Sequence, residues 1–126
     1  MAHRRNPDWL DLSNTPEQIE LADRRLKLLP HDKLVLSRGI TEEEMAMSQK
    51  EYEILLACGL RADDVVTHLE LAQHIWKQSE IDFPLSKTMQ VTVNHLRSRM
   101  PDVLGDPRRG VIRTRRNVGY YAVKHL

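Results

Sequence analysis

Ser86-Lys-Thr-Met-Gln-Val-Thr-Val-Asn-His-Leu-Arg-Ser-Arg-Met100 is followed, after a loop, by Val111-Ile-Arg-Thr-Arg-Arg-Asn-Val-Gly-Tyr-Tyr-Ala-Val123, and these two segments indicate the fold. Met89, Val93, Leu96 and Met100 recur at helical spacing, which predicts a helix with one buried stripe. Pro101 ends that helix, and Gly105-Asp-Pro107 forms a loop. Val111–Thr114 and Gly119–Val123 then alternate as two strands around Arg115–Val118, which predicts a β-hairpin.

Charge is strongly polarised along the chain. From Lys87 to the C-terminus there are nine Lys and Arg residues against two acids, a balance of +7, whereas residues 1–86 have ten against sixteen, a balance of −6. The near-neutral total of +1 hides this division. A positive end that combines a helix with a hairpin suits a surface that neutralises phosphates and reads a groove.

Two capping boxes predict the helices that precede this region. Ser48-Gln-Lys-Glu51 begins a helix with Tyr52, Leu55 and Leu56 on its apolar face, and Thr67-His-Leu-Glu70 begins a second helix with Leu69, Ala72, Ile75 and Trp76. With the helix at Ser86, the order is three helices and then a hairpin. That order predicts an α+β fold of the winged helix-turn-helix type.

The N-terminal third leaves two alternatives open. Thr15-Pro16-Glu17 has the pattern of a helix start, with Ile19, Leu21 and Leu26 following. The second interpretation makes Leu26–Leu29 and Lys33–Ser37 two strands around a turn at Pro30, with a third short strand at Glu44–Met47. We therefore divide the chain into a tail or short helix at 1–25, docked through Trp9, and a winged-helix domain at 26–126.

Composition and cysteine content exclude several classes of protein. The 126 residues are 40% hydrophobic and 29% charged, as in ordinary globular domains, and no apolar run approaches the roughly 20 residues of a membrane span. No apolar signal core follows the N-terminus, so we expect a cytoplasmic protein. A single cysteine, Cys58, excludes an internal disulfide and a multi-cysteine zinc site, and we expect no metal and no cofactor. No nucleophile–base pair or phosphate loop is present, so we expect no enzyme.

The outer face of the predicted third helix carries side chains that can read base pairs. Gln90 and Asn94 can pair with adenine, Arg97 can pair with guanine, and Val91 can meet a thymine methyl. Lys87 and Thr88 are expected at the helix start, where the helix dipole and a cation both favour a phosphate. In the hairpin, Arg113, Arg115 and Arg116 crowd into four positions, which favours an anionic partner.

At these residues the chain resembles the OmpR/PhoB-type winged-helix DNA-binding domain of bacterial response regulators. The matching segments are Met47–Leu56, Leu71–Trp76, Lys87–Arg97 and Ile112–Tyr120, in the family's order and spacing. The resemblance implies a small antiparallel sheet before the first helix. It also implies a sequence-specific transcription regulator of double-stranded DNA, with the third helix in the major groove and the wing on the minor groove.

The resemblance also implies residue roles. Phosphate contacts fall on Trp76, Lys87, Thr92, Asn94 and Thr114, and we add Arg113 and Arg115 from the hairpin charge. Base contacts fall on Gln90, Val91, His95 and Arg97 in the major groove and on Arg116 in the minor groove. The loop at Lys77–Pro84 matches a region that contacts RNA polymerase in the family.

Three departures from the family pattern stand out. Asn94 and His95 occupy positions where many members have arginines, and Asn117 replaces a common glycine. We also expect no receiver domain, because the 47 residues before Ser48 are too few to form one. A homodimer is plausible, since a small recognition surface often needs two half-sites. The alternative is a winged helix that binds RNA polymerase or another regulator without reading DNA.

Overall fold

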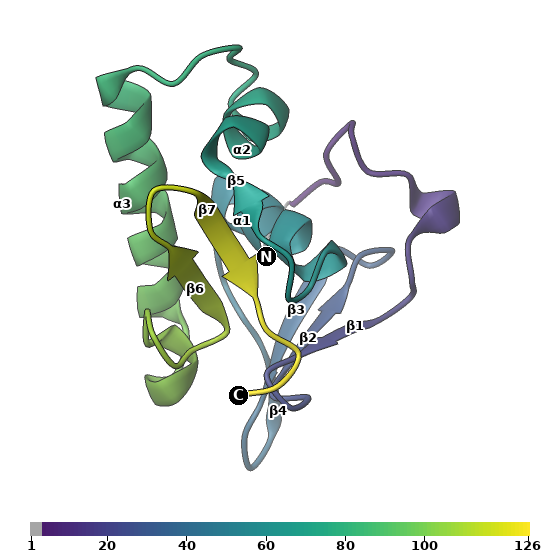
Figure 1. The fold of residues 1–126 in the computed structure, drawn as a ribbon. Helices are drawn as coiled ribbons and strands as arrows, with labels where there is room; N and C mark the ends of the chain where they lie inside the picture. Colours follow the sequence, from purple (N-terminus) through teal and green to yellow (C-terminus); the bar gives the residue numbers. More distant parts are fainter. Residues whose placement is uncertain (1–3) are drawn as a thin grey trace.

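The computed structural model describes residues 4–126, which form two antiparallel sheets and three α-helices (Figure 1). The first sheet has the strand order β1 (Ile19–Leu21), β2 (Leu26–Leu29), β3 (Leu34–Arg38) and β4 (Glu42–Glu44). The helices are α1 (Gln49–Leu60), α2 (His68–Ile75) and α3 (Phe83–Arg99). The second sheet has the order β5 (Val66–Thr67), β7 (Gly119–Ala122) and β6 (Ile112–Arg115). Two 3₁₀ turns, Leu12–Asn14 and Asp102–Gly105, complete the elements. The winged helix-turn-helix prediction is confirmed.

The helix predicted from Thr15-Pro16-Glu17 is wrong. Ile19 and Leu21 instead form β1 and pair with Leu28 and Leu26 of β2. Both side chains are buried with Glu20 exposed between them, so the alternation fits a strand. The backbone then passes through three consecutive positive φ angles, 54° to 69°, at Ala22–Arg24, which a right-handed helix cannot contain. The segment expected as a separate tail thus contributes a strand to the first sheet.

The strand predicted at Leu26–Leu29 is confirmed, and its neighbours are shifted slightly. The strand predicted at Lys33–Ser37 runs from Leu34 to Arg38, because Lys33 has a φ of 58° and belongs to the turn. The strand predicted at Glu44–Met47 is misplaced: β4 is Glu42–Glu44, whereas Met45 and Met47 are buried in the core beyond its end.

Both capping boxes form as predicted. Ser48 Oγ accepts from the Glu51 backbone N–H at 3.2 Å while the Glu51 carboxylate accepts from the Ser48 N–H at 3.1 Å. Thr67 and Glu70 make the same reciprocal pair at the start of α2. These bonds satisfy backbone donors that the first helical turn leaves unpaired.

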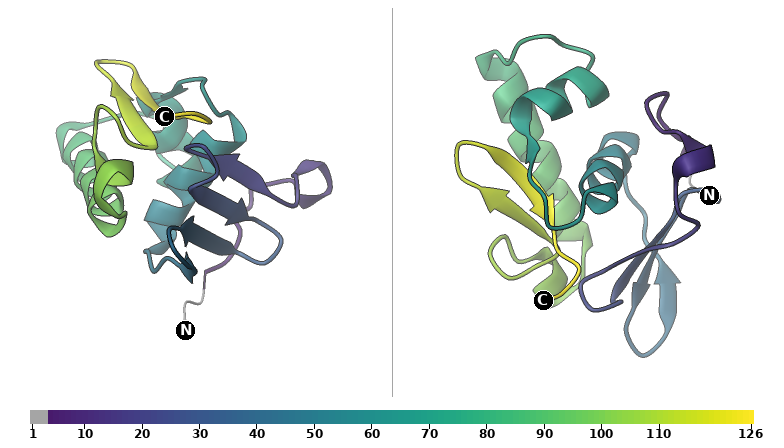
Figure 2. Two further views of the ribbon diagram at one scale, coloured as in Figure 1. Left: turned by 90° about the horizontal axis from the view of Figure 1, so that it is seen from below. Right: turned by 45° about the vertical axis from the view of Figure 1, so that its right-hand side comes forward.

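Helix α1 contacts both sheets, which lie on either side of it (Figure 2). Gly59 faces the first sheet so closely that an added Cβ would lie 3.4 Å from Leu21 Cδ1. On the other side, Cys58 Sγ lies 4.0 Å from the Tyr120 carbonyl oxygen of β7. Tyr52, Ile54, Leu55 and Leu56 are fully buried along α1. The core is therefore built around this helix.

The C-terminus joins the two sheets. Ala22 N–H donates to the Val123 carbonyl at 2.9 Å, and Asp23 N–H donates to the Lys124 carbonyl at 2.8 Å. The Leu126 N–H donates in turn to the Asp23 carboxylate at 3.1 Å. The tight turn after β1 is thus fixed by the last residues of the chain.

Candidate nucleic-acid interface

Helix α3 lies along one side of the molecule and exposes much of its length (Figure 1). It begins at Phe83, three residues before the predicted start, because the Asp82 carboxylate accepts from the Leu85 N–H at 2.8 Å and Pro84 fits the first turn. Lys87 and Thr88 therefore lie in the second turn, so their expected position at the helix start is wrong. The buried stripe of Met89, Val93 and Leu96 is confirmed, with Leu85 extending it.

The opposite face of α3 carries the residues expected to read bases. Gln90, Val91 and His95 are exposed, as are Lys87 and Asn94. Thr92 is half-buried, and its hydroxyl donates to the Thr88 carbonyl at 2.7 Å. A phosphate contact by Thr92 would have to compete with this internal bond.

Strands β6 and β7 form the predicted wing. Arg115 pairs with Gly119, and the turn between them closes with the Val118 N–H donating to the Arg115 carbonyl at 3.0 Å. Asn117 adopts a φ of 64° in this turn, a conformation that asparagine tolerates better than most residues. Arg115 and Arg116 are exposed at the tip. Gly119 is required by close approach, because a Cβ there would lie 2.0 Å from the Val66 carbonyl oxygen.

Arg97 connects α3 to the wing. Its Nε donates to the Ile112 carbonyl at 3.1 Å, and its Nη2 donates to Thr114 Oγ1 at 2.8 Å. The guanidinium also lies 5.8 Å from the centre of the Tyr120 ring. Burial lowers the pKa of Arg97, opposed by the nearby Tyr120 and Asp106. The guanidinium is thus hydrogen-bonded to strand β6 of the wing. Its expected role in reading bases stays a prediction. Thr114 accepts this bond, which leaves its own hydrogen to donate.

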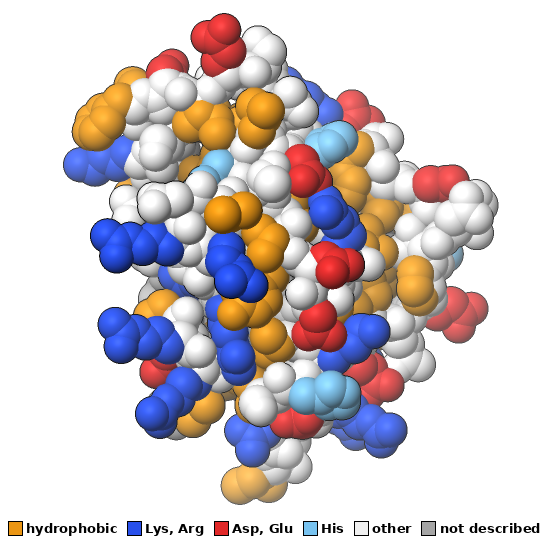
Figure 3. Space-filling model, viewed as in Figure 1, with side chains coloured by type: hydrophobic (Ala, Val, Ile, Leu, Met, Phe, Trp, Pro, Cys, Tyr) orange, Lys and Arg blue, Asp and Glu red, His pale blue; other side chains and the backbone are white. Residues whose placement is uncertain are grey.

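Two further arginines of the basic segment have internal partners. Arg99 Nε donates to the Glu51 carboxylate at 2.9 Å, and the Glu51 side chain is only 2% exposed. Arg113 donates to the carbonyls of Gly110 and Arg109 at 3.0 and 3.3 Å. The uneven distribution of charge persists in three dimensions: Lys and Arg side chains gather over α3 and the β6–β7 hairpin, with most acids on the other half of the same face (Figure 3).

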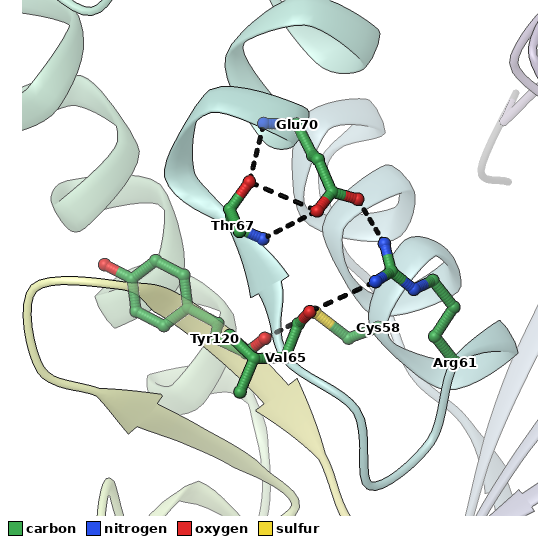
Figure 4. A network of polar contacts seen from close by, with 6 residues as sticks. All are labelled: Cys58, Arg61, Val65, Thr67, Glu70 and Tyr120. Atoms are coloured by element: carbon green, nitrogen blue, oxygen red, sulfur yellow. Dashed lines mark hydrogen bonds and ion pairs between the residues drawn. The ribbon is translucent and has the colours of Figure 1, made fainter.

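The N-terminus of α2 is linked to α1 by an ion pair and to the wing by backbone hydrogen bonds (Figure 4). Arg61, at the end of α1, forms an ion pair with Glu70 and donates to the Val65 carbonyl at 3.3 Å. Thr67 pairs with Gly119 in the second sheet, and the His68 N–H donates to the Val118 carbonyl at 3.0 Å. At the other end of α2, Trp76 is half-buried against the core with Lys50 Nζ 5.8 Å from its ring centre.

Sequence reasoning assigned no role to Tyr120, which lies at the junction of these elements. Its ring packs edge-on against His68 at 5.4 Å and also faces Arg97. The only sequence signal was its place after Gly119 in the hairpin motif. Within residues 4–126, no cluster of three or more His, Cys, Asp or Glu side chains could hold a metal ion, and no helix is long and apolar enough to cross a membrane.

Comparison with known proteins gives one family match. The model of the family described as "Transcriptional regulatory protein, C terminal" matches residues 42–122, which include all three helices and the wing. Among solved structures, the DNA-binding domain of RstA from Klebsiella pneumoniae, in complex with the RstA box, superposes with a TM-score of 0.68 at 21% identity. This match covers 87% of this chain and 100% of that domain.

Two further structures have the same fold. The DNA-binding domain of CpxR from E. coli has a TM-score of 0.70 at 22% identity, covering 89% of this chain and 100% of that one. The response regulator DrrB from Thermotoga maritima, an OmpR/PhoB homologue, has a TM-score of 0.69 at 24% identity. The match covers 88% of this chain but only 46% of DrrB.

Proposed function

The chain belongs to the family of transcriptional regulatory protein C-terminal domains, and from that premise we propose that it binds double-stranded DNA in a sequence-specific manner. Helix α3 enters the major groove, and the wing lies on the adjacent minor groove. The observation that carries this proposal is the joining of an exposed polar face of α3 to a basic hairpin through Arg97. The RstA DNA-binding domain, which has the same fold, was solved in complex with the RstA box, and this supports the same function here.

We assign base reading in the major groove to Gln90, Val91 and His95. The Gln90 amide can donate to and accept from adenine, and Val91, 41% exposed, can pack on a thymine methyl. The exposed imidazole of His95 offers a ring nitrogen to a base edge. Arg116, at the exposed tip of the wing, inserts into the minor groove. Arg97 can contact a base only if its guanidinium breaks the hydrogen bonds to the Ile112 carbonyl and Thr114 Oγ1.

Phosphate contacts complete the surface. Lys87 and Arg115 supply exposed cations, and Thr114 can donate its hydroxyl hydrogen while it accepts from Arg97. The other proposed contacts are Trp76, Thr92, Asn94 and Arg113. Each cation that neutralises a phosphate releases counterions, so affinity falls steeply as salt rises.

Selection of bound sequences from random duplexes, followed by fluorescence anisotropy on the selected site, tests the proposal. Arg116→Ala should weaken binding and reduce the salt slope by about 1. Gln90→Ala should relax preference at one base pair, by about 1–3 kcal/mol. The matched control is Arg25→Ala, which removes an exposed arginine just before β2 and should leave binding unchanged. Absence of duplex binding by the wild-type chain at low salt would refute the proposal.

A second candidate function is contact with RNA polymerase through the α2–α3 connection and the start of α3. Two apolar side chains are exposed there, Ile81 of the connection at 37% and Phe83, the first residue of α3, at 81%. A contiguous exposed apolar patch marks a protein-contact site, and this candidate rests on these two side chains lying two positions apart in the sequence. Phe83→Ser should then reduce transcription activation while leaving DNA affinity intact. Self-association on two half-sites also remains a proposal, and the stoichiometry of the DNA complex tests it.

A further inference from the structure

Arg108 and Arg109 lie in the loop between α3 and the wing and have no role in the function proposed above. Both side chains are exposed. Neither guanidinium forms an ion pair with the side chains that the structure describes, those of residues 4–101 and 103–126. Two adjacent exposed cations of this kind favour an anionic partner.

Hydrogen bonds fix the backbone of the loop that carries these two arginines. The Asp106 carboxylate accepts from the Arg108 N–H at 2.7 Å and from the Arg109 N–H at 3.0 Å. These bonds hold the pKa of the Asp106 carboxyl below its ordinary value, so they persist at neutral pH. Arg113 of β6 donates to the Gly110 and Arg109 carbonyls from the other side of the loop. The loop is therefore preorganised, and a ligand need not order it on binding.

An open hollow of about 390 Å³ lies between this loop and α3. Three consecutive loop residues line one side and three residues of α3 line the other: Gly105, Asp106 and Pro107, and Asn94, Arg97 and Ser98. Asn94 and Ser98 are exposed and lie about one helical turn apart, in line with Val91. The hollow therefore continues the face of α3 to which we assign base reading.

The position of the hollow along α3 indicates what it would contact. Ser98 lies eight residues after Gln90, a separation of about 12 Å along the axis at roughly 1.5 Å per residue. The major groove is itself only about 12 Å wide. A helix that places Gln90 over the base edges therefore brings Ser98 to the sugar–phosphate wall of the groove. The chemical group at that wall is a phosphate, and exposed arginines neutralise phosphates.

We propose that the hollow receives the backbone of one DNA strand at the edge of the major groove, and that Arg108 and Arg109 neutralise its phosphates. This inference rests on the proposed binding of double-stranded DNA, and it extends that surface from α3 and the wing to the loop between them. Asp106 also lines the hollow, but its carboxylate is already bonded to two N–H groups and stands beside two cations.

Fluorescence anisotropy of the full chain on its selected duplex, over a range of salt concentrations, tests the inference. Arg108→Gln combined with Arg109→Gln removes two charges and keeps both backbone N–H groups. We expect affinity at low salt to fall at least about tenfold, and the slope of log Kd against log salt to fall by about 1.8, or about 0.9 per phosphate. Preference among duplexes that differ by one base pair should not change, because phosphate contacts carry no sequence information.

The matched control is Arg24→Gln combined with Arg25→Gln. This variant makes the same change in net charge at two exposed arginines just before β2, on the first sheet. Its salt slope should equal that of the wild type. Ethylation of single phosphates locates the contact, because the Arg108→Gln, Arg109→Gln variant should become insensitive to ethylation at one or two phosphates that wild-type binding requires.

A charge placed inside the hollow provides the second arm. Ser98→Glu introduces a carboxylate where the DNA backbone should lie, and Ser98→Gln adds a side chain of the same length without the charge. We expect Ser98→Glu to bind at least about tenfold more weakly than Ser98→Gln at low salt, and the difference to shrink as salt rises. Circular dichroism of each variant verifies the fold.

The outcomes separate this inference from the proposed function. If the wild type binds duplex DNA but the Arg108→Gln, Arg109→Gln variant keeps the salt slope of the control, the inference is wrong and the proposed function stands. Equal affinities of Ser98→Glu and Ser98→Gln likewise overturn the placement of the backbone in the hollow. Absence of duplex binding by the wild type at low salt overturns both.

Discussion

Replacing Arg97 by alanine should loosen the wing from α3 and thereby weaken DNA binding at every base pair alike. The change removes two charge-assisted hydrogen bonds, to the Ile112 carbonyl and to Thr114 Oγ1, together with the contact of the guanidinium with Tyr120. Such bonds contribute about 1.5–3 kcal/mol each when well shielded. Because Thr114 is exposed and Arg97 only half-buried, we expect a total loss of about 2 kcal/mol in the free energy of unfolding.

A double-mutant cycle isolates the bond that crosses from helix to wing. Thr114→Val removes the hydroxyl acceptor and should cost about 1 kcal/mol on its own. If the bond forms, the coupling energy between Arg97→Ala and Thr114→Val should be about 1 kcal/mol. This value is above the deviation from additivity of roughly 0.3–0.5 kcal/mol that independent sites show. Urea unfolding followed by tryptophan fluorescence measures both values. Arg25→Ala serves as the control for removing an arginine.

The DNA arm of the same experiment separates two roles for Arg97. Anisotropy on duplexes that differ by single base pairs should show a uniform loss of affinity if Arg97 positions the wing. A change in preference at one base pair, with stability unchanged and coupling near zero, would refute the positioning role and assign Arg97 to base reading.

Three further predictions follow from the buried and terminal groups. Arg99→Ala leaves the Glu51 carboxylate buried without its cation and should cost about 2–3 kcal/mol in urea unfolding, whereas the double variant with Glu51→Gln should recover part of that loss. Hydrogen bonds from the Leu126 N–H and His125 hold the pKa of the Asp23 carboxyl below its ordinary value. The ionised carboxylate therefore stabilises the fold at pH values above that ordinary value, and this stabilisation is lost as the pH falls through the lowered pKa. Asp23→Asn should flatten the acid limb of the curve of stability against pH, and identical curves for the variant and the wild type would contradict this. Burial raises the pKa of Cys58 to about 12, so the native protein should not react with iodoacetamide at pH 8 unless it unfolds, as followed by mass spectrometry.

The three helices and the wing were predictable, apart from the start of α3, because their signals act over a few residues. The capping boxes at Ser48 and Thr67 join side chains to backbone groups three positions away, and both form as predicted. The stripe of Met89, Val93 and Leu96 similarly fixes which face of α3 is buried. The exposure of Gln90 and His95 follows directly from that stripe.

The partners of the basic residues and the fold of the N-terminal region depend on contacts between segments that are far apart in the sequence. Ile19 and Leu21 are too few to distinguish a helix from a strand, and pairing with β2 settles the choice. Arg97 and Arg99 look alike in the sequence, yet one bonds to the wing 15 residues later and the other to a helix 48 residues earlier. Residues this far apart in the sequence come into contact only after the chain has folded around α1, so a local sequence pattern cannot predict these contacts.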